Sequence, residues 1–345
     1  MNQPLVSIIV PVYRVEDYLE TCIRSLLEQD YAELEIIAVN DASPDGSLQL
    51  LENMAAQDSR LKILTNSENK GVSASRNRAL EVAAGDYVLF VDADDWLDRE
   101  TVGRCLEALQ KNEADVCLFA YTREFHKNSM PKYLFQSDQV LDEAGCRNLQ
   151  RRLIGPVGPE LAFPAMLDSL GTIWGKLYRR ELLAGIQFVD LHIIGTAEDT
   201  LFNTRVFQQV KKAVYLNRPY YHYRKFNSGS ETKQYKPDLY LQWNQLFTLL
   251  EAEARNEEAR NALSNRIALS IFGLGLNERL SGHSWSRRKK QLQVIMNQPH
   301  YQEAYAQLTF RYFPVHWKIF FQSARRGYYC ILLSLIEVIH RVINR

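Results

Sequence analysis

The fold is decided by one stretch, DYVLFVDADDW, residues 86–96. Its apolar run over residues 87–91 predicts a strand that is buried on both faces. Three carboxylates, Asp92, Asp94 and Asp95, follow that run directly. Carboxylates that are crowded and buried without a positive partner repel one another at a cost of several kcal/mol. The stretch therefore predicts a strand that ends in a site for a positive ligand.

The position of these carboxylates indicates which kind of ligand binds there. The tips of parallel strands are where α/β sheets bind ligands, and hard oxygen atoms suit divalent cations that carry phosphates. We therefore expect a divalent metal with a bound phosphate group. The alternative is that Asp94 or Asp95 caps a helix that begins near Leu97.

Around this stretch, apolar runs alternate with amphipathic helical patterns and short polar loops. This alternation predicts a doubly wound, mostly parallel α/β sheet over residues 1–122. The predicted strands cover residues 5–10, 34–39, 61–64, 87–91 and 115–121, and the predicted helices cover 16–29, 47–56 and 71–84.

Beyond residue 122 the alternation is lost. We expect one domain over residues 1–230, with a first half over 1–122 and a second half over 123–230, and a C-terminal α-helical region over 231–345. The polar stretch 227–230 is a candidate lid. In the second half the predicted helices cover 142–153, 172–186 and 197–210, and the predicted strands cover 213–216 and 220–223.

The composition excludes several classes of protein. Lys+Arg and Asp+Glu are equal at 41 each, so no overall charge favours nucleic acid as a partner. The five cysteines are scattered without metal-ligand or redox spacing, which favours reduced thiols in the cytoplasm. The sequence has no signal-peptide pattern at its start and no apolar run long enough to span a membrane.

The segment 311–345 has six basic residues and the single acid Glu337. Apolar residues recur in it every seven positions, which predicts one helix with a broad apolar face and cations elsewhere. Such a helix can lie on an anionic membrane surface. The alternative is that it packs on its own protein or on a second subunit, as in a homodimer.

The loop after the first strand, PVYRVE at residues 11–16, contains no glycine. A dinucleotide-binding loop needs closely spaced glycines, and no Gly-Lys-Ser phosphate loop occurs anywhere in the chain. Tyr13 in this loop could stack on a flat base, and Asp41 could accept a hydrogen bond from a ring N–H group. A core or turn role is the alternative for both residues.

Four motifs together resemble the family 2 glycosyltransferases. They stand in the order of that family and cover about residues 5–98, and a further block resembles the acceptor-side half. The motifs are VSIIVPVY (6–13), VNDASPDGS (39–47), NKGVSASRN (69–77) and FVDADD (90–95), and the further block consists of WGKLYRR (174–180) and AEDTLF (197–202).

The resemblance implies an A-type glycosyltransferase fold and inverting transfer from a nucleotide-diphosphate sugar, most often a UDP-sugar. It also implies that residues 1–230 are the catalytic domain, with a nucleotide-sugar-binding half (1–122) and an acceptor-side half (123–230). It implies that Asp94 ligates Mn²⁺ or Mg²⁺ on the diphosphate, a role that suits a hard oxygen ligand. Asp92 would face the ribose, beside Ala93. The nucleotide-binding residues implied by the same motifs are Pro11, Val12, Tyr13, Asp41, Asn69 and Arg76.

An inverting transfer needs a base for the proton of the acceptor hydroxyl. By the family's Glu-Asp motif, Asp199 would be this base and Glu198 would position the acceptor; without the family context, both would merely begin a helix. Trp174 would form an apolar face for a sugar or, equally, belong to the core. His222 is a candidate metal ligand or a structural residue, and Arg224 a candidate phosphate contact.

The predicted function is transfer to a hydroxyl of a glycan or lipid-linked oligosaccharide in cell-surface polysaccharide synthesis. The expected location is the cytoplasmic face of the membrane. One alternative is a nucleotidyltransferase, which would need a Gly-rich basic loop in place of residues 11–13. The other is a non-catalytic nucleotide-sugar-binding relic or assembly partner, which would be expected to lack Asp92, Asp94 or Asp199, and all three are present.

Overall fold

The computed structural model describes residues 3–164, 170–225 and 234–343. The chain forms two compact units. The first comprises Met1–Leu149, Thr172–Asp190 and Arg205–Gly229, and the second comprises Gln150–Gly171, Leu191–Thr204 and Ser230–Arg345. The segments 150–171 and 191–204 thus join the helical unit, although the sequence placed them in the catalytic domain. The predicted lid at 227–230 and the predicted boundary at 230 lie outside the described residues.

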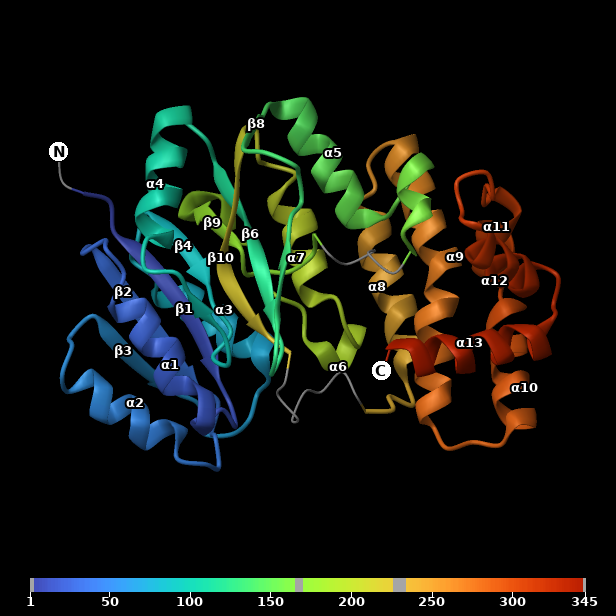
Figure 1. The fold of residues 1–345 in the computed structure, drawn as a ribbon, viewed down its shortest axis with the longest axis horizontal. Helices are drawn as coiled ribbons and strands as arrows, with labels where there is room; N and C mark the ends of the chain where they lie inside the picture. Colours follow the sequence, from blue (N-terminus) through green and yellow to red (C-terminus); the bar gives the residue numbers. More distant parts are fainter. Residues whose placement is uncertain (1–2, 165–169, 226–233, 344–345) are drawn as a thin grey trace. The chain divides into compact units, whose positions relative to one another are not determined.

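Within the described residues, ten strands of the first unit form one mixed sheet in the order β3-β2-β1-β4-β9-β6-β10-β5, with β7 beside β6 and β8 beside β10 (Figure 1). The strands are β1 (Val6–Val12), β2 (Leu34–Asn40), β3 (Leu61–Thr65), β4 (Tyr87–Phe90), β5 (Trp96–Leu97), β6 (Val116–Glu124), β7 (Ser129–Lys132), β8 (Gln139–Leu141), β9 (Lys176–Arg179) and β10 (Ala213–Arg224).

The predicted parallel arrangement is confirmed for the strands that come first in the chain. β1 pairs in parallel with β2 and with β4, and β2 pairs in parallel with β3. Short crossover helices join these strands, because parallel neighbours cannot be joined by a tight turn. The helices of the first unit are α1 (Glu16–Leu27), α2 (Ser47–Ala55), α3 (Val72–Val82), α4 (Thr101–Asn112) and the 3₁₀ helix η3 (Arg180–Leu183).

Helices cover both faces of this sheet. Apolar residues of α1, α2 and α4 form one buried cluster with alternate residues of β1, such as Ile8 and Val10. α3 contacts β1 and β2, whose other alternate residues, such as Ile9 and Ile37, are buried outside that cluster. A sheet that is apolar on both faces explains why its strands read as continuous apolar runs rather than as alternating patterns.

The prediction of a helix over residues 172–186 is wrong. These residues form β9, which pairs antiparallel with β4 on one side and with β6 on the other, and then η3. Gly175 has a φ of 74°, a left-handed conformation that glycine adopts without strain and that interrupts a helix. The apolar spacing around it reflects burial on both faces of the sheet.

The last strand of the first unit is longer than predicted. Residues 213–216 and 220–223 belong to one strand, β10, whose pairing with β6 shifts register on both sides of Pro219. Proline cannot donate to the ladder and therefore disturbs a strand locally without ending it. The short strands β7 and β8 were not predicted, because they are polar and largely exposed.

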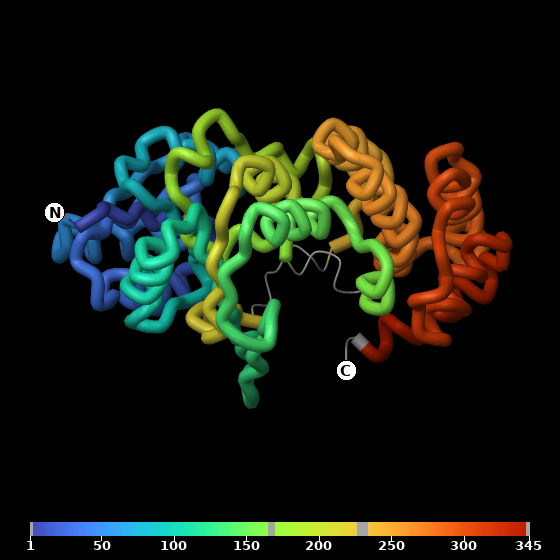
Figure 2. The backbone as a smooth tube through the Cα atoms, turned by 90° about the horizontal axis from the view of Figure 1, so that it is seen from above, coloured from blue at the N-terminus to red at the C-terminus, as the bar shows by residue number. Residues whose placement is uncertain are grey.

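The second unit is helical, as predicted. A second buried cluster holds it together, and α9 packs against α8, α10, α11 and α13 (Figure 2). Its elements are the 3₁₀ helix η1 (Gly158–Ala162) and the helices α6 (Leu191–Ile194), α8 (Leu239–Glu253), α9 (Glu257–Leu280), α10 (Trp285–Met296), α11 (Pro299–Gln307), α12 (Val315–Arg325) and α13 (Tyr329–Ile343), while α5 (Glu143–Ile154) and α7 (Glu198–Val206) have residues in both units.

The single helix predicted over residues 311–345 is two helices. α12 ends at Arg325, and Gly327 follows with a φ of 73°. The N–H of Tyr328 donates to the carbonyl of Ser323, which closes the helix end in the manner of a glycine C-cap. Arg345 lies outside the described residues. Among the helices that are described, none has both the length and the apolar character needed to cross a membrane.

Candidate active site

The predicted nucleotide-binding residues lie at one edge of the sheet, where the parallel strands end. Val12 of β1 is paired with Asn40 of β2, so the loops that follow these two strands start side by side. The N–H of Asp41 donates to the carbonyl of Val12 at 2.9 Å. The residues that follow β4 lie at the same edge, because β4 is paired in parallel with β1.

Asp92 forms an ion pair with Arg76, which the sequence assigned to the same site. Arg76 Nη2 lies 2.9 Å from Asp92 Oδ1, and the side chains of the two residues are 4% and 31% exposed. The Arg76 guanidinium also lies over the ring of Phe188. Arg76 lies on α3, so this helix places a buried cation at the acidic strand end.

Asp94 lies beside Arg224 of β10. The Nε atom of Arg224 donates to the Asp94 carbonyl at 2.7 Å, and its guanidinium is held between the rings of Trp96 and Tyr18. Cation–π contacts of this kind restrain a guanidinium that would otherwise be mobile. The predicted phosphate contact and the predicted metal ligand are therefore neighbours.

Asp95 is fully buried and holds the acidic loop in place. Tyr221 donates its hydroxyl hydrogen to Asp95 Oδ2 at 2.7 Å and accepts from the N–H of Asp92, while the N–H of Arg224 donates to Asp95 Oδ1 at 2.8 Å. Burial and then the charges of Asp94 and Asp92 raise the pKa of Asp95 well above its usual range. Three carboxylates are thus crowded at this strand end, with Arg76 and Arg224 beside them.

Neither Asp94 nor Asp95 caps a helix, so the alternative derived from the sequence is wrong. The short strand β5 follows directly, and α4 begins only at Thr101, whose hydroxyl donates to the carbonyl of Asp98. This leaves the Asp94 side chain partly exposed at the sheet edge.

Asp41 is buried and organises the loop that contains Asn69. Its Oδ1 accepts from Asn66 Nδ2 at 2.6 Å and from the N–H of Lys70 at 2.9 Å, and its Oδ2 accepts from the N–H of Gly71 at 2.8 Å. Asn69 is exposed on this loop and accepts from the same Gly71 N–H. Asp41 therefore has a structural role in this loop, and its contact with a base stays a prediction.

The loop after β1 contributes Tyr13, which is half-buried and carries the Arg14 guanidinium over its ring at 5.3 Å. Pro11 is half-buried, whereas Val12 is fully buried. Ala93 is likewise 3% exposed. Neither Val12 nor Ala93 therefore offers an exposed side chain to a ligand.

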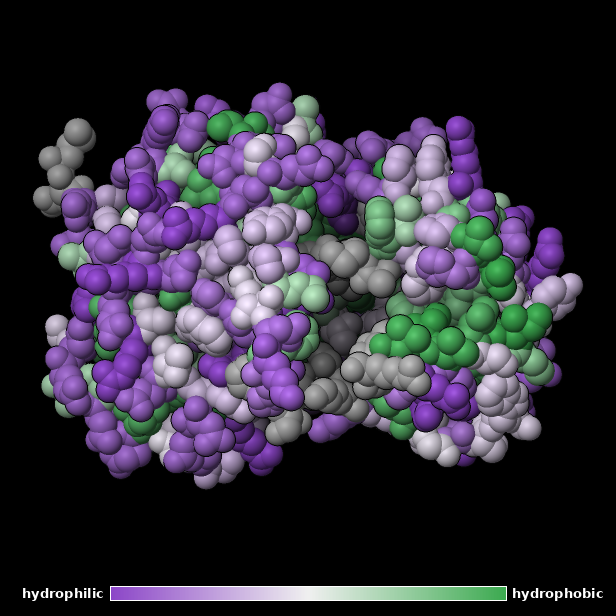
Figure 3. All heavy atoms as spheres, viewed as in Figure 1, coloured by the Kyte–Doolittle hydropathy of each residue, from purple (hydrophilic) through white to green (hydrophobic). Residues whose placement is uncertain are grey.

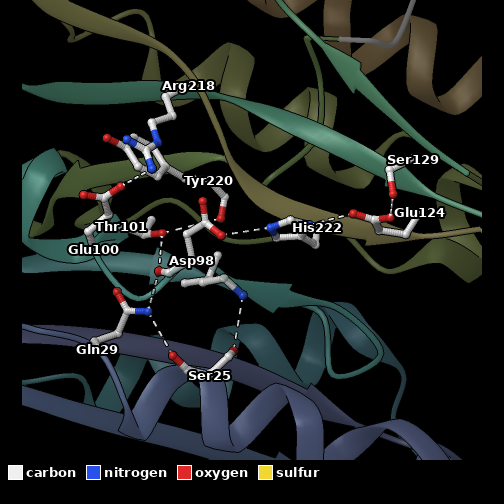
Figure 4. A network of polar contacts seen from close by, with 11 residues as sticks. Ser25, Gln29, Asp98, Glu100, Thr101, Glu124, Ser129, Arg218, Tyr220 and His222 are labelled. Carbon is white, nitrogen blue, oxygen red and sulfur yellow. Dashed lines mark hydrogen bonds and ion pairs between the residues drawn. The ribbon is translucent and has the colours of Figure 1, made fainter.

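His222 lies in a network of polar contacts (Figure 4). Its Nδ1 is 2.7 Å from Glu124 Oε1 and its Nε2 is 3.1 Å from Asp98 Oδ1, so both ring nitrogens have partners and neither contacts Asp94. Its ring stacks on Trp96 at 5.0 Å. This environment favours the structural alternative for His222 over a role as a metal ligand.

Trp174 is 5% exposed and lies among aromatic residues. Its ring stacks on Tyr221 at 4.5 Å and also contacts Tyr121 and Tyr223. These contacts favour the core alternative for Trp174 over a face for a sugar ring. Through Tyr221, the packing of Trp174 supports the position of Asp95.

Glu198 and Asp199 lie in the first turn of α7, within the part of that helix that belongs to the second unit. Both side chains are half-buried, and the positive end of the helix dipole favours their ionised forms. The preceding turn is held by Lys236, which donates to the carbonyl of Gly195, and by Trp243, which donates to Thr196 Oγ1. These contacts fix the start of α7.

Sequence reasoning missed Tyr221 and the tie that it makes to Asp95. The alternation of β10 contains a signal, because side chains two apart in a strand share a face. Tyr221 and Tyr223 both contact Trp174, whereas His222 and Arg224 both contact Trp96. An assignment of these two faces from the sequence would have placed Tyr221 and Tyr223 in the aromatic packing. It would have placed His222 and Arg224 on the face that makes the polar contacts.

Comparisons with known proteins agree with this geometry. Residues 7–154 match the model of glycosyl transferase family 2. The chain is 33% identical over 235 residues to the uncharacterized glycosyltransferase EpsJ of Bacillus subtilis, over 68% of this chain and 65% of EpsJ. It is 30% identical over 314 residues to the putative glycosyltransferase EpsH of the same organism, over 88% of this chain and 86% of EpsH.

Solved structures resemble the chain over nearly its whole length. Residues 1–349 of S. aureus TarS in complex with UDP-GlcNAc match with a TM-score of 0.67 and 21% sequence identity, over 98% of this chain and 92% of that chain. At this identity the likeness concerns the fold. It agrees with an A-type glycosyltransferase fold followed by helices, as predicted.

Proposed function

The chain belongs to glycosyltransferase family 2, and from this premise we propose that it transfers a sugar from a UDP-sugar to an acceptor hydroxyl with inversion at the anomeric carbon. The observation that carries the proposal is the acidic strand end formed by Asp92, Asp94 and Asp95, with Arg76 and Arg224 beside it. The UDP-GlcNAc complex of TarS supports a UDP-sugar as the donor.

The residues of the strand end fit a divalent cation bound together with a diphosphate. Three carboxylates lie within four residues here, and after burial the charges of Asp94 and Asp92 raise the pKa of Asp95, so this strand end would attract a cation. Among the described residues, no group of three His, Cys, Asp or Glu side chains could hold a metal ion by itself. Asp94 would therefore hold Mn²⁺ or Mg²⁺ jointly with donor oxygens, and the cation would neutralise charge on the departing diphosphate.

The other residues of the first unit would bind and orient the donor. Arg224 is restrained between two aromatic rings and would contact a phosphate, for which a guanidinium is well suited. Tyr13 and the loop held by Asp41 would flank the base, and Asp92 would face the ribose. The buried tie between Tyr221 and Asp95 would keep these groups in place before the donor binds.

In the transfer step, Asp199 would take the proton of the acceptor hydroxyl while the acceptor oxygen attacks the anomeric carbon. The bond from that carbon to the diphosphate breaks, and UDP leaves from the opposite face. Glu198 would position the acceptor. We infer that the acceptor is a glycan or a lipid-linked oligosaccharide of a surface polysaccharide, and that the enzyme works at the cytoplasmic face of the membrane.

Donor binding tests the proposal directly. A panel of nucleotides and UDP-sugars, with and without Mn²⁺, is screened for a shift in the unfolding midpoint of the wild-type chain. A ligand at a hundred times its Kd stabilises the folded state by about 2.7 kcal/mol, which such a screen detects. A Mn²⁺-dependent shift with UDP and one UDP-sugar is expected, whereas no shift with any nucleotide would contradict donor binding.

The role of Asp199 is tested separately by Asp199→Asn. Because the amide cannot take a proton, turnover should fall at least ~10²-fold, while the affinity for UDP stays within a factor of about two. The measurement is UDP release at saturating donor and acceptor, next to UDP titration of the same variant. Turnover near that of the wild type would place the base elsewhere.

A further inference from the structure

The helix α13 carries an apolar surface that the second unit leaves exposed. Tyr328, Ile331, Val338 and Val342 are 52%, 48%, 56% and 68% exposed. Their spacings of three, seven and four residues place them along one side of the helix, with Tyr328 just before its first residue. Figure 3 shows hydrophobic residues gathered over α13. We call these four residues the α13 stripe.

A different side of α13 anchors the helix to its own unit. Tyr329, Leu332, Leu333 and Ile336 are buried in the core of the second unit. Glu337 is held by Arg279 Nε at 2.6 Å and by Arg288 Nη1 at 2.8 Å. The helix is thus apolar on two sides, and the stripe is not needed to hold it in place.

Cations border the α13 stripe. Arg325 and Arg326 are exposed just before α13. Arg341 is exposed within α13, between Val338 and Val342 of the stripe. None of these three arginines forms an ion pair in the part of the chain that the structure describes. The nearby acid Glu337 is neutralised by its own two arginines. The surface around the stripe is therefore cationic.

We propose that the α13 stripe docks on the surface of an anionic phospholipid bilayer. Its apolar side chains would enter the boundary between headgroups and acyl chains, while Arg325, Arg326 and Arg341 would meet the lipid phosphates. Tyr328 suits this depth, because its ring is apolar and its hydroxyl is polar. The combination of an apolar stripe and bordering cations matches such a surface in both respects.

The charge argues against a second copy of the chain as the occupant. In a two-fold symmetric contact, the same surface of each copy meets the other. The arginines that border the stripe of one copy would then lie close to those of its partner, and like charges that face each other disfavour association. An anionic bilayer offers the opposite charge instead.

The test is co-sedimentation of the full chain with vesicles of phosphatidylglycerol and, separately, of phosphatidylcholine. Binding to phosphatidylglycerol should exceed binding to phosphatidylcholine and should weaken as salt is added. The double variant I331Q/V338Q should lower binding to phosphatidylglycerol by about tenfold or more, because less apolar surface enters the bilayer. Val82→Gln is the matched control, since Val82 on α3 is 52% exposed and lies outside the stripe.

Three outcomes would overturn the inference. They are absence of wild-type binding to phosphatidylglycerol, unchanged binding by I331Q/V338Q, and a dimer in solution that I331Q/V338Q converts to monomers. The UDP-induced shift of the unfolding midpoint is measured on the same samples. This inference rests on the membrane location given in the proposed function, and its failure is distinguishable from failure of sugar transfer: loss of vesicle binding leaves the UDP shift intact, and absence of the UDP shift leaves vesicle binding intact.

Discussion

Two buried carboxylates lie at opposite ends of the parallel strands, and the groups that surround them differ. Glu35, near the start of β2, accepts hydrogen bonds from Ser7 Oγ, from the N–H groups of Ala84 and Gly85, and from Lys62 Nζ. Asp95, just past the end of β4, has Asp94 and Asp92 as its charged neighbours.

The pKa values of the two groups record this difference. Burial alone would raise the pKa of Glu35, but hydrogen bonds from Lys62, Ser7 and Ala84 outweigh it and lower the pKa. Burial and neighbouring carboxylates both raise the pKa of Asp95. The comparison teaches that one end of the sheet surrounds its buried carboxylate with donors and a cation, whereas the other end crowds three carboxylates together, where a cationic ligand would be stabilised.

The largest expected effect separates activity from stability. Asp94→Ala should reduce turnover at least ~10³-fold, because a cation on the diphosphate contributes several kcal/mol to the transition state. Its free energy of unfolding should not fall, since a repulsive charge is removed beside Asp95. Glu35→Ala should do the reverse, with a loss of about 3 kcal/mol of unfolding free energy from unsatisfied buried donors and turnover within about twofold.

Sugar transfer by the folded fraction and urea unfolding measure the two effects. If Asp94→Ala unfolded the chain, or if Glu35→Ala abolished transfer while the protein stayed folded, the distinction between the two ends would be lost.

A smaller effect is expected from the support of the acidic loop. Tyr221→Phe removes the hydroxyl that donates to Asp95 and accepts from Asp92, so the affinity for UDP with Mn²⁺ should fall by about tenfold. Tyr178→Phe is the matched control, because Tyr178 is equally buried and its hydroxyl donates to the carbonyl of Ile173 instead. Calorimetric titration of both variants measures the affinities, and equal losses would point to general destabilisation.

The smallest effect is the pH dependence of stability. Because the folded pKa of Asp95 is raised, its contribution is complete below the unfolded pKa of about 3.9 and is lost as pH rises through the folded pKa. Because the folded pKa of Glu35 is lowered, its contribution is present above the unfolded pKa of about 4.3 and is lost as pH falls through the folded pKa.

Each unit of difference between folded and unfolded pKa corresponds to about 1.4 kcal/mol. The stability of the wild type relative to Asp95→Asn should therefore fall with rising pH, and that relative to Glu35→Gln should rise. Urea unfolding between about pH 2.5 and pH 7 measures both differences, that of Glu35 below about pH 4.3 and that of Asp95 above about pH 3.9. Parallel profiles for the two variants would contradict the opposite assignments.

Much of the first unit could be predicted from the sequence, because each strand there is a continuous apolar run ended by a polar loop. β9 could not, because its environment comes from β4 and β6, whose partners in the sheet are set by the whole topology. The break at Gly327 was missed because the apolar repeat continues on both sides of it. A repeat in sequence says nothing of whether the backbone between its members stays helical.

The same holds for the candidate site, where residues in local motifs could be predicted and contacts between distant residues could not. Asp92, Asp94 and Arg76 were selected by motifs, and the ion pair between Arg76 and Asp92 agrees with their selection. The surroundings of His222 could not be foreseen, since its partners Glu124 and Asp98 are about a hundred positions away in the chain. Contacts between residues so distant depend on the register between strands rather than on any local pattern.

The position of β9 also bears on how the chain folds as it is synthesised. β3, β2, β1 and β4 are complete once residue 90 has left the ribosome, but the edge of β4 waits for residues 176–179. At about 5–20 residues per second, this delay lasts roughly 4–18 s. A buried apolar strand with an open edge can pair with another chain during that time. Nascent or truncated chains that end before β9 are therefore the species most prone to aggregate.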